Sequence, residues 1–263
     1  MSIITLTTDF GLKDGNVGVM KGVIWGIAPQ AQIADISHLI APQNVAEASL
    51  ILLRSATYFP LESVHVVVVD PGVGTARRPM AARVGSWYYV GPDNGALTLL
   101  LEHAGQAGWL VSLVHLDRPQ YWLSDVSHVF HGRDIFAPAA AHLANGVALA
   151  ELGSPFDDPV LLDLPRPQRS PQGWRGEVIH VDYFGNLSTN IRVEHLGQPD
   201  RVLVRIAGAE IEGLARTFGE RPIGSLVALY GSTGNLIISV VNGSAAQQLS
   251  VGPGIAVDVI VEG

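Results

Sequence analysis

The first part of the chain alternates strand-like apolar runs with helix-like segments. We expect strands at residues 3–8, 32–36 and 66–69, separated by helices at 17–27 and 44–57, where apolar residues recur at helical spacing. This order is typical of right-handed crossovers in a mostly parallel sheet. The four consecutive valines at 66–69 predict a third strand that is buried on both faces, as in the centre of such a sheet.

The pattern changes along the rest of the chain. A hairpin is expected from 80–84 and 87–90, followed by a helix at 96–102, a strand at 110–116 and an Ala-rich helix opened by 130–134. Residues 164–173 are Pro-rich and polar, which is typical of a linker. Beyond them short strands are expected at 177–181, 202–206, 226–229, 236–241 and 256–261. The sequence therefore predicts an α/β domain at 1–163 with a mostly parallel sheet, then a small all-β, barrel-like domain at 174–263.

Composition narrows the functional classes. The formal net charge of −8 argues against nucleic acid or an anionic membrane as a partner. No apolar run approaches the roughly 20 residues that a membrane-spanning helix needs. The chain contains no cysteine, and its start lacks the basic and apolar regions of a signal peptide. We therefore expect a soluble cytoplasmic protein.

The candidate chemistry gathers at the ends of the expected strands. Asp70 directly follows the valine run, where open α/β sheets bind their ligands. Arg77 comes seven residues later, and a short loop through Gly74 could fold it back over Asp70. A structural salt bridge that closes this loop is the alternative. His131 lies at the start of a predicted helix, and Asp134 follows about one turn later. His128 is the alternative candidate for the functional histidine.

A metal centre is a further alternative. Strand-end loops also carry Asp9, Asp14 and Asp93, and such carboxylates together with a histidine resemble a hydrolytic metal site. The sequence has no His-x-His and no His-Glu-x-x-His motif. We expect no metal and no cofactor, and a metal-dependent nucleotide hydrolase stays as an alternative.

Five motifs in order carry a resemblance to a known family: 8–11 (Thr-Asp-Phe-Gly), 70–78 (Asp-Pro-Gly-Val-Gly-Thr-Ala-Arg-Arg), 91–95 (Gly-Pro-Asp-Asn-Gly), 130–134 (Phe-His-Gly-Arg-Asp) and 182–186 (Asp-Tyr-Phe-Gly-Asn). Together they resemble the S-adenosyl-L-methionine (SAM) hydroxide adenosyltransferases. These hydrolases convert SAM to adenosine and L-methionine and are relatives of the fluorinase and chlorinase. The resemblance covers nearly the whole chain and both expected domains.

The resemblance implies a catalytic set and an assembly. It implies a homotrimer whose sites lie between the N-terminal domain of one subunit and the C-terminal domain of a neighbour. The family's water-activating Asp-Arg-His set corresponds to Asp70, Arg77 and His131. The halogenases carry other residues at the Asp and His positions and a long insertion after this loop. The compact segment at 80–88 therefore favours hydroxide over halide.

Substrate contacts follow from the same resemblance. Asp9 corresponds to a carboxylate that holds the ribose diol, and Asn16 is a further candidate contact. Asp182 and Ser232 resemble groups that hold the amino and carboxylate ends of methionine. Asn186, Phe218 and Gly243 resemble the adenine pocket, while Gln43 stands where the halogenases place a Trp near the ribose.

The chemistry of the residues leaves the base open. A solvated Asp, with a pKa near ~3.9, is a poor base for water, whereas His131 can orient water or take its proton. A neighbouring Arg lowers the basicity of Asp70 but stabilises a hydroxide-like oxygen. A SAM or adenosine sensor that binds without turnover is the alternative from a different functional class.

Overall fold

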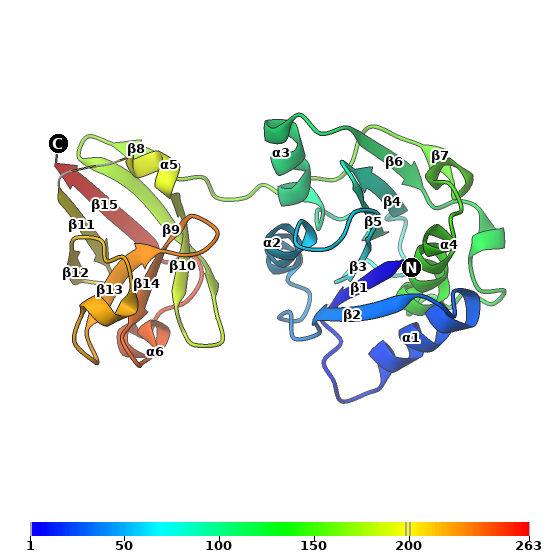
Figure 1. Cartoon of the computed structure of the whole chain (residues 1–263), viewed down its shortest axis with the longest axis horizontal. Helices are drawn as coiled ribbons and strands as arrows, with labels where there is room; N and C mark the ends of the chain where they lie inside the picture. The colour runs from blue at the N-terminus through cyan, green and yellow to red at the C-terminus, as the bar shows by residue number, and fades with distance from the viewer. Residues whose placement is uncertain (1, 198, 200, 263) are drawn as a thin grey trace. The chain divides into compact units, whose positions relative to one another are not determined.

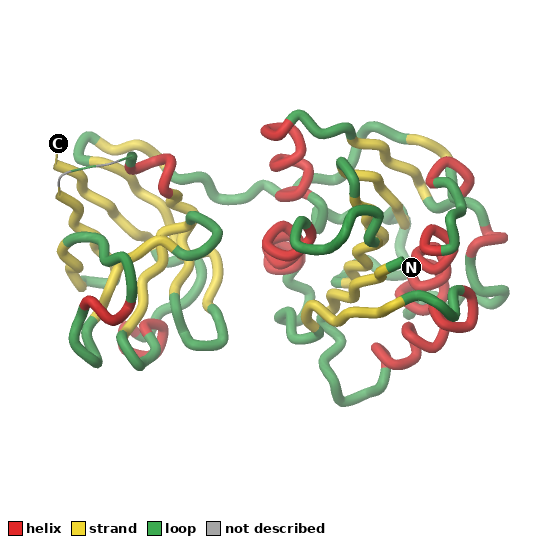
Figure 2. Tube along the Cα trace, in the orientation of Figure 1, coloured by secondary structure: helices red, strands yellow, loops and turns green. Residues whose placement is uncertain are grey.

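The computed structural model describes residues 2–197, 199 and 201–262. The chain divides at Asp163 and Leu164 into two compact units, each with its own sheet and its own hydrophobic core (Figure 1). Figure 2 shows helices and strands together in the first unit and mainly strands in the second.

The first unit is built on one mixed sheet. Its strands are β1 (Ile3–Thr8), β2 (Gln32–Ser37), β3 (Val64–Val68), β4 (Pro79–Val84), β5 (Trp87–Pro92), β6 (Val111–His115) and β7 (Ser154–Pro155). They lie in the order β2-β1-β3-β5-β4-β6-β7. The pairs β1–β2, β1–β3 and β3–β5 are parallel, and β4 pairs antiparallel with both β5 and β6. The parallel arrangement predicted for the first three strands and the predicted hairpin are both confirmed.

Helices cover both faces of this sheet (Figure 1). The helices α1 (Asn16–Ile27) and α4 (Ala137–Ala144) share one core with Val66 and Val68, whereas α2 (Val45–Ala56) and α3 (Thr98–Ala107) share the other with Val67 and Val69. Successive side chains of a strand point to opposite faces, so the valine run supplies both cores in turn. All four valines are buried, as the sequence predicts.

The helix that carries the 130–134 motif begins irregularly. Gly132–Phe136 (η2) is a π-helical turn, in which the amide of Ala137 donates to the carbonyl of Gly132. The regular helix α4 follows directly. Two 3₁₀ turns, η1 (Pro119–Tyr121) and η3 (Leu149–Glu151), lie before and after it.

The second unit is a barrel-like antiparallel sheet. Its strands are β8 (Gln168–Ser170), β9 (Gly173–Val181), β10 (Leu187–Arg192), β11 (Arg201–Ile206), β12 (Ala209–Glu212), β13 (Leu226–Tyr230), β14 (Asn235–Val240) and β15 (Ala256–Glu262). Seven of them lie in the order β12-β11-β15-β9-β10-β14-β13, and β8 pairs with β9 beside this path. A bridge between Ala215 and Leu229 brings the chain after β12 onto β13. Only short helices interrupt the described part: α5 (Val193–Leu196), η4 (Phe218–Glu220) and α6 (Ala245–Leu249). The predicted fold class is confirmed.

The expected linker is shorter in the structure than in the sequence. Gln168–Ser170 forms β8 and pairs with the start of β9, so Pro171 and Gln172 make a two-residue hairpin turn. The proline that suggests a linker is therefore part of a folded turn. Gly173, at the start of β9, has a φ of +150°, and a Cβ there would lie 2.1 Å from the carbonyl oxygen of Val259. Within the expected linker, residues 164–167 lie outside any helix, strand or turn.

Candidate active site

Asp70 stands at the end of the central strand of the first unit. Its side chain is 5% exposed. The amide of Val73 donates to the carbonyl of Asp70 at 3.2 Å, which closes a tight turn. On the other side the Asn94 amide group donates to the carbonyl of Val69 at 2.9 Å. The backbone that carries the carboxylate is thus held by hydrogen bonds at Val69 and at Asp70.

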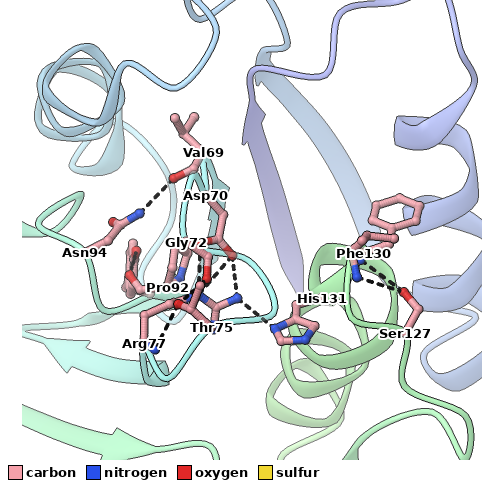
Figure 3. Close-up of polar contacts among 12 residues, drawn as sticks. Val69, Asp70, Gly72, Thr75, Arg77, Pro92, Asn94, Ser127, Phe130 and His131 are labelled. Carbon is pink, nitrogen blue, oxygen red and sulfur yellow. Dashed lines mark hydrogen bonds and ion pairs between the residues drawn. The ribbon is translucent and has the colours of Figure 1, made fainter.

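Arg77 folds back onto this carboxylate, as its spacing predicts (Figure 3). Its Nε lies 2.9 Å from Asp70 Oδ1 and 3.0 Å from Oδ2, and Nη2 also donates to Oδ2. The Arg77 side chain is 10% exposed, and its guanidinium carbon lies 5.3 Å from the centre of the Phe136 ring. A buried pair with several hydrogen bonds holds its geometry far better than a surface salt bridge does.

The loop that connects the two residues lies against the segment that carries the histidines. Thr75 Oγ1 donates to the carbonyl of Gly72 at 2.7 Å and stabilises the bend. Gly74 has a φ of +76°, and a Cβ there would lie 2.2 Å from the carbonyl oxygen of His128. Any side chain at Gly74 would force the two loops apart.

His131 completes the set. Arg77 Nη2 lies 2.8 Å from His131 Nδ1 (Figure 3). A guanidinium only donates, so Nδ1 must accept, and the neutral ring then carries its proton on Nε2. Burial, followed by the charge of Arg77, lowers the pKa of His131 below its ordinary value of 6.5. His128, the competing histidine, is exposed and meets the loop through its backbone.

Asp134 supports the segment before His131, a role that the sequence does not reveal. Its fully buried carboxylate accepts the Ser127 amide at 2.9 Å and the guanidinium of Arg133. The Ser127 hydroxyl in turn accepts the amide of Phe130 at 3.1 Å (Figure 3). Burial raises the pKa of Asp134, but the hydrogen bonds from Arg133 and Ser127 outweigh it, so the pKa lies below its ordinary value.

Asp9 lies at the same edge of the sheet as Asp70. Thr8 pairs with Val68 on neighbouring parallel strands, and the two aspartates follow these strands. Asp9 Oδ2 accepts the backbone amide of Gln43 at 2.8 Å, and Gln43 itself has a φ of +65°. Asn16, the other candidate contact in this unit, is the first residue of α1.

The remaining candidate contacts lie in separate turns of the second unit. Asp182 Oδ1 accepts the amides of Phe184 at 3.0 Å and Asn186 at 2.9 Å, and its Oδ2 accepts the Asn186 side chain at 2.7 Å. Asp182 therefore holds its own turn between β9 and β10. Ser232 lies in the β13–β14 turn, Gly243 follows β14 and Phe218 begins η4. Their contact with a substrate stays a prediction.

Asp93 is a structural residue rather than a free ligand. Its carboxylate accepts Arg78 Nε at 2.9 Å and the amide of Val160 at 2.8 Å. Arg78 also donates to Asp158 Oδ1 at 2.6 Å. The only sequence signal for the network around Asp93 is the Arg-Arg pair at 77–78. The first arginine pairs with Asp70 and the second with Asp93.

The described residues bear on the alternative of a metal centre and on the absence of a membrane-spanning run from the sequence. No group of three or more His, Asp or Glu side chains there is arranged to hold a metal ion. No helix in the described part of the chain is long and apolar enough to cross a membrane.

Both units of the chain match the models of one known protein family. Residues 4–153 match the model of the SAM hydroxide adenosyltransferase N-terminal domain, and residues 176–258 match that of its C-terminal domain. The chain belongs to the SAM hydroxide adenosyltransferase family. Both matches keep the order of the two units, one on each side of residues 164–167.

Several relatives are similar to this chain along nearly their whole length. A protein of Salinispora arenicola named (R)-S-adenosyl-L-methionine hydrolase is 41% identical over 95% of each chain. One of the same name from Thermus thermophilus is 39% identical over 98% of this chain and 99% of its own. A fluorinase of Nocardia brasiliensis is more distant, at 27% identity over 98% of this chain. The crystal structure of an uncharacterized conserved protein from Thermotoga maritima superposes with a TM-score of 0.89 at 38% identity, covering 97% of this chain and 99% of that one.

Proposed function

We propose that this adenosyltransferase is an enzyme that hydrolyses SAM to adenosine and L-methionine. The observation that carries the proposal is the part-buried contact set Asp70–Arg77–His131, which lies at the carboxyl edge of the parallel strands in the unit that the family model matches. The names of relatives at 39% and 41% identity support the same substrate.

In the proposed reaction a water oxygen attacks the ribose 5′ carbon in line with the carbon–sulfur bond. The carbon–oxygen bond forms as the carbon–sulfur bond breaks, and the electron pair of the carbon–sulfur bond goes to sulfur. Methionine then leaves as a neutral thioether. The opposite charges of a hydroxide-like oxygen and a sulfonium cancel in the transition state. A site that holds the attacking water but excludes bulk solvent therefore favours the step.

The geometry supports Asp70 as the proton acceptor. Because Nδ1 of His131 accepts from Arg77 and Nε2 carries the proton, the neutral imidazole offers the water a donor rather than a base. The proton of the attacking water then passes to Asp70 and on to solvent. Arg77 stabilises the developing negative charge on the oxygen. His131 orients the water through its Nε2 proton.

The reaction as written needs only water and SAM. The prefix in the relatives' names specifies the R configuration at the sulfonium, and we propose the same epimer here.

Since candidate contacts are divided between the two units, we propose a homotrimer in which a neighbouring subunit completes the site. Its contributing residues would be Asp182, Asn186, Phe218, Ser232 and Gly243. SAM is a soluble, charged metabolite, so we propose a cytoplasmic location.

The test is hydrolysis of each sulfonium epimer of SAM in ¹⁸O-water, followed by mass spectrometry with and without EDTA. We expect labelled adenosine, unlabelled methionine, a preference for the R epimer and no effect of EDTA. Binding of SAM without release of adenosine would identify a sensor instead. Inhibition by EDTA would point to a metal-dependent hydrolase. Sedimentation of the intact chain checks the trimer, and a monomer with full SAM affinity would contradict the shared site.

A further inference from the structure

Two buried histidine–threonine pairs lie along β1. Thr5 Oγ1 is 2.8 Å from His65 Nδ1 in the middle of the strand, and Thr8 Oγ1 is 2.9 Å from His38 Nδ1 at its end. All four residues are at most 5% exposed. The pairs are chemically alike, but only the second lies beside the turn that carries Asp9.

His38 is one member of a chain of polar contacts that starts at the surface. Lys21 Nζ lies 2.6 Å from Asp35 Oδ2, and His38 Nε2 lies 3.0 Å from Asp35 Oδ1. From His38 the chain continues through Thr8 to the amide of Phe10, which donates to Thr8 Oγ1 at 3.2 Å. Residues of α1, of β2 and the segment directly after it, and of β1 are thereby connected to the turn that follows β1.

The charge of Asp35 favours one direction for the hydrogen bond between His38 and Thr8. Burial raises the pKa of Asp35, but the hydrogen bonds from Lys21 and His38 outweigh it and hold the pKa below its ordinary value of 3.8. Asp35 Oδ1 lies 3.0 Å from Nε2 of His38, and a carboxylate only accepts, so this contact favours a proton on Nε2 and leaves Nδ1 to accept the hydroxyl proton of Thr8. The oxygen of Thr8 is then free to accept the amide of Phe10.

Asp35, His38 and Thr8 have the composition of a hydrolytic triad, but they do not form one. The Thr8 side chain is fully buried, and its oxygen is already engaged by the amide of Phe10. It cannot reach a substrate as a nucleophile. The chain of contacts therefore acts on the turn itself.

His38 holds this turn at two points. Through Thr8 it fixes the amide of Phe10, and its own carbonyl accepts the amide of Gly11 at 2.8 Å. The residue between Thr8 and Phe10 is Asp9, whose carboxylate also accepts the amide of Gln43. The orientation of the Asp9 carboxylate thus depends on His38 at one side and on Gln43 at the other.

We propose that His38 is a positioning residue for substrate recognition, which orients Asp9 toward the ribose diol through Thr8 and the 9–11 turn. This inference rests on the proposed function, because it takes Asp9 as the diol ligand. A carboxylate suits a diol, since two adjacent hydroxyls can donate to its two oxygens. A turn that shifts by a few tenths of an ångström would lose this paired geometry first.

The experiment compares SAM with its 2′-deoxy analogue in the full-length protein. The wild type should favour SAM in kcat/KM by at least about tenfold, the usual size of a hydrogen bond to a charged group. In His38→Leu this preference should fall to about twofold, mainly through a higher KM for SAM. His38→Asn keeps an acceptor near the Nδ1 position and should retain most of the preference.

His65→Leu is the matched control. It removes the same kind of buried pair from the same strand, so it should lower the free energy of unfolding comparably while leaving the preference for SAM at the wild-type value. If His38→Leu does not fold, Asp35→Ala weakens the same chain of contacts from its exposed end and should also reduce the preference. An undiminished preference in Asp35→Ala and His38→Leu, or an equal reduction in His65→Leu, would overturn the proposal.

The outcome is separable from that of the proposed function. If the wild type binds SAM without turnover, calorimetric binding of adenosine and 2′-deoxyadenosine to the same variants gives the same comparison. A wild-type protein that turns over SAM but accepts the 2′-deoxy analogue equally well would contradict the role of Asp9, and with it that of His38, while leaving hydrolysis intact.

Discussion

Arg77 donates a hydrogen bond from Nη2 to Nδ1 of His131 at 2.8 Å, and this one contact determines which nitrogen of the imidazole carries the proton. The same guanidinium engages both oxygens of Asp70. A single arginine therefore gives the two neighbouring side chains opposite characters, an acceptor at Asp70 and a donor at His131.

Substitutions at His131 should distinguish a donor from a base. Glutamine places an amide N–H near the Nε2 position, whereas asparagine reproduces only the Nδ1 side. If His131 donates to the attacking water, His131→Gln should retain about tenfold more kcat than His131→Asn, as measured by adenosine release. Equal losses of kcat in the two variants would indicate that His131 acts as the base instead. His128→Gln, at the exposed neighbouring histidine, should behave as wild type.

Asp70→Asn should remove the proton acceptor without removing the binding site. We expect kcat to fall by ~10²–10⁴, the usual contribution of general acid–base groups, with SAM affinity largely kept in calorimetry. Arg77→Lys should be similarly impaired, because an ammonium group cannot engage Asp70 and His131 in the planar geometry of a guanidinium. If the three residues act as one unit, double variants should cost little more than the worst single variant. Wild-type rates in both single variants would show that the catalytic residues lie elsewhere.

His65 should make the protein less stable in acid. Burial lowers the pKa of His65 from 6.5 to about 4. Between these values the unfolded chain takes up a proton that the folded chain does not, so stability is complete above pH 6.5 and falls as the pH drops toward 4. The free energy of unfolding should lose about 2 kcal/mol from this residue between pH 7 and pH 5. Urea titrations of wild type and His65→Leu check it, since the variant should lack this component.

Arg78 should matter for stability rather than for chemistry. The Asp93 side chain is only 2% exposed, so Arg78→Met would leave its carboxylate buried without the guanidinium. We expect a loss of about 3 kcal/mol in the free energy of unfolding, largely recovered in the Arg78→Met/Asp93→Asn double variant. Arg83→Met removes a mostly exposed partner of Glu62 and should cost less than about 1 kcal/mol. Equal effects of the two single variants would contradict this assignment.

The sequence predicts those parts of the molecule that local patterns determine. The valine run 66–69 indicates a central strand, and the seven-residue spacing of Asp70 and Arg77 indicates a loop that closes on itself. Contacts between distant segments escape such patterns. The pairing of Arg77 with His131 spans 54 residues, that of Thr8 with His38 spans 30, and the 2.2 Å approach at Gly74 depends on a loop far along the chain. The strand β8 was missed for another reason, because its hairpin turn has the composition of a linker.

In a regular helix the direction of the His131 side chain would depend on how the alanines of α4 pack against the sheet. The π-helical turn after His131 makes the two independent of each other. An α-helix turns about 100° per residue, so the direction of its first side chain is fixed by the packing of the rest. The wider turn at Gly132–Phe136 holds one additional residue, which changes the angular offset between His131 and the alanine face of α4. The buried alanines can therefore keep their fit against the sheet while the imidazole faces Arg77. Deleting one residue within this turn would restore a regular helix and swing the imidazole around the helix axis, away from its partner.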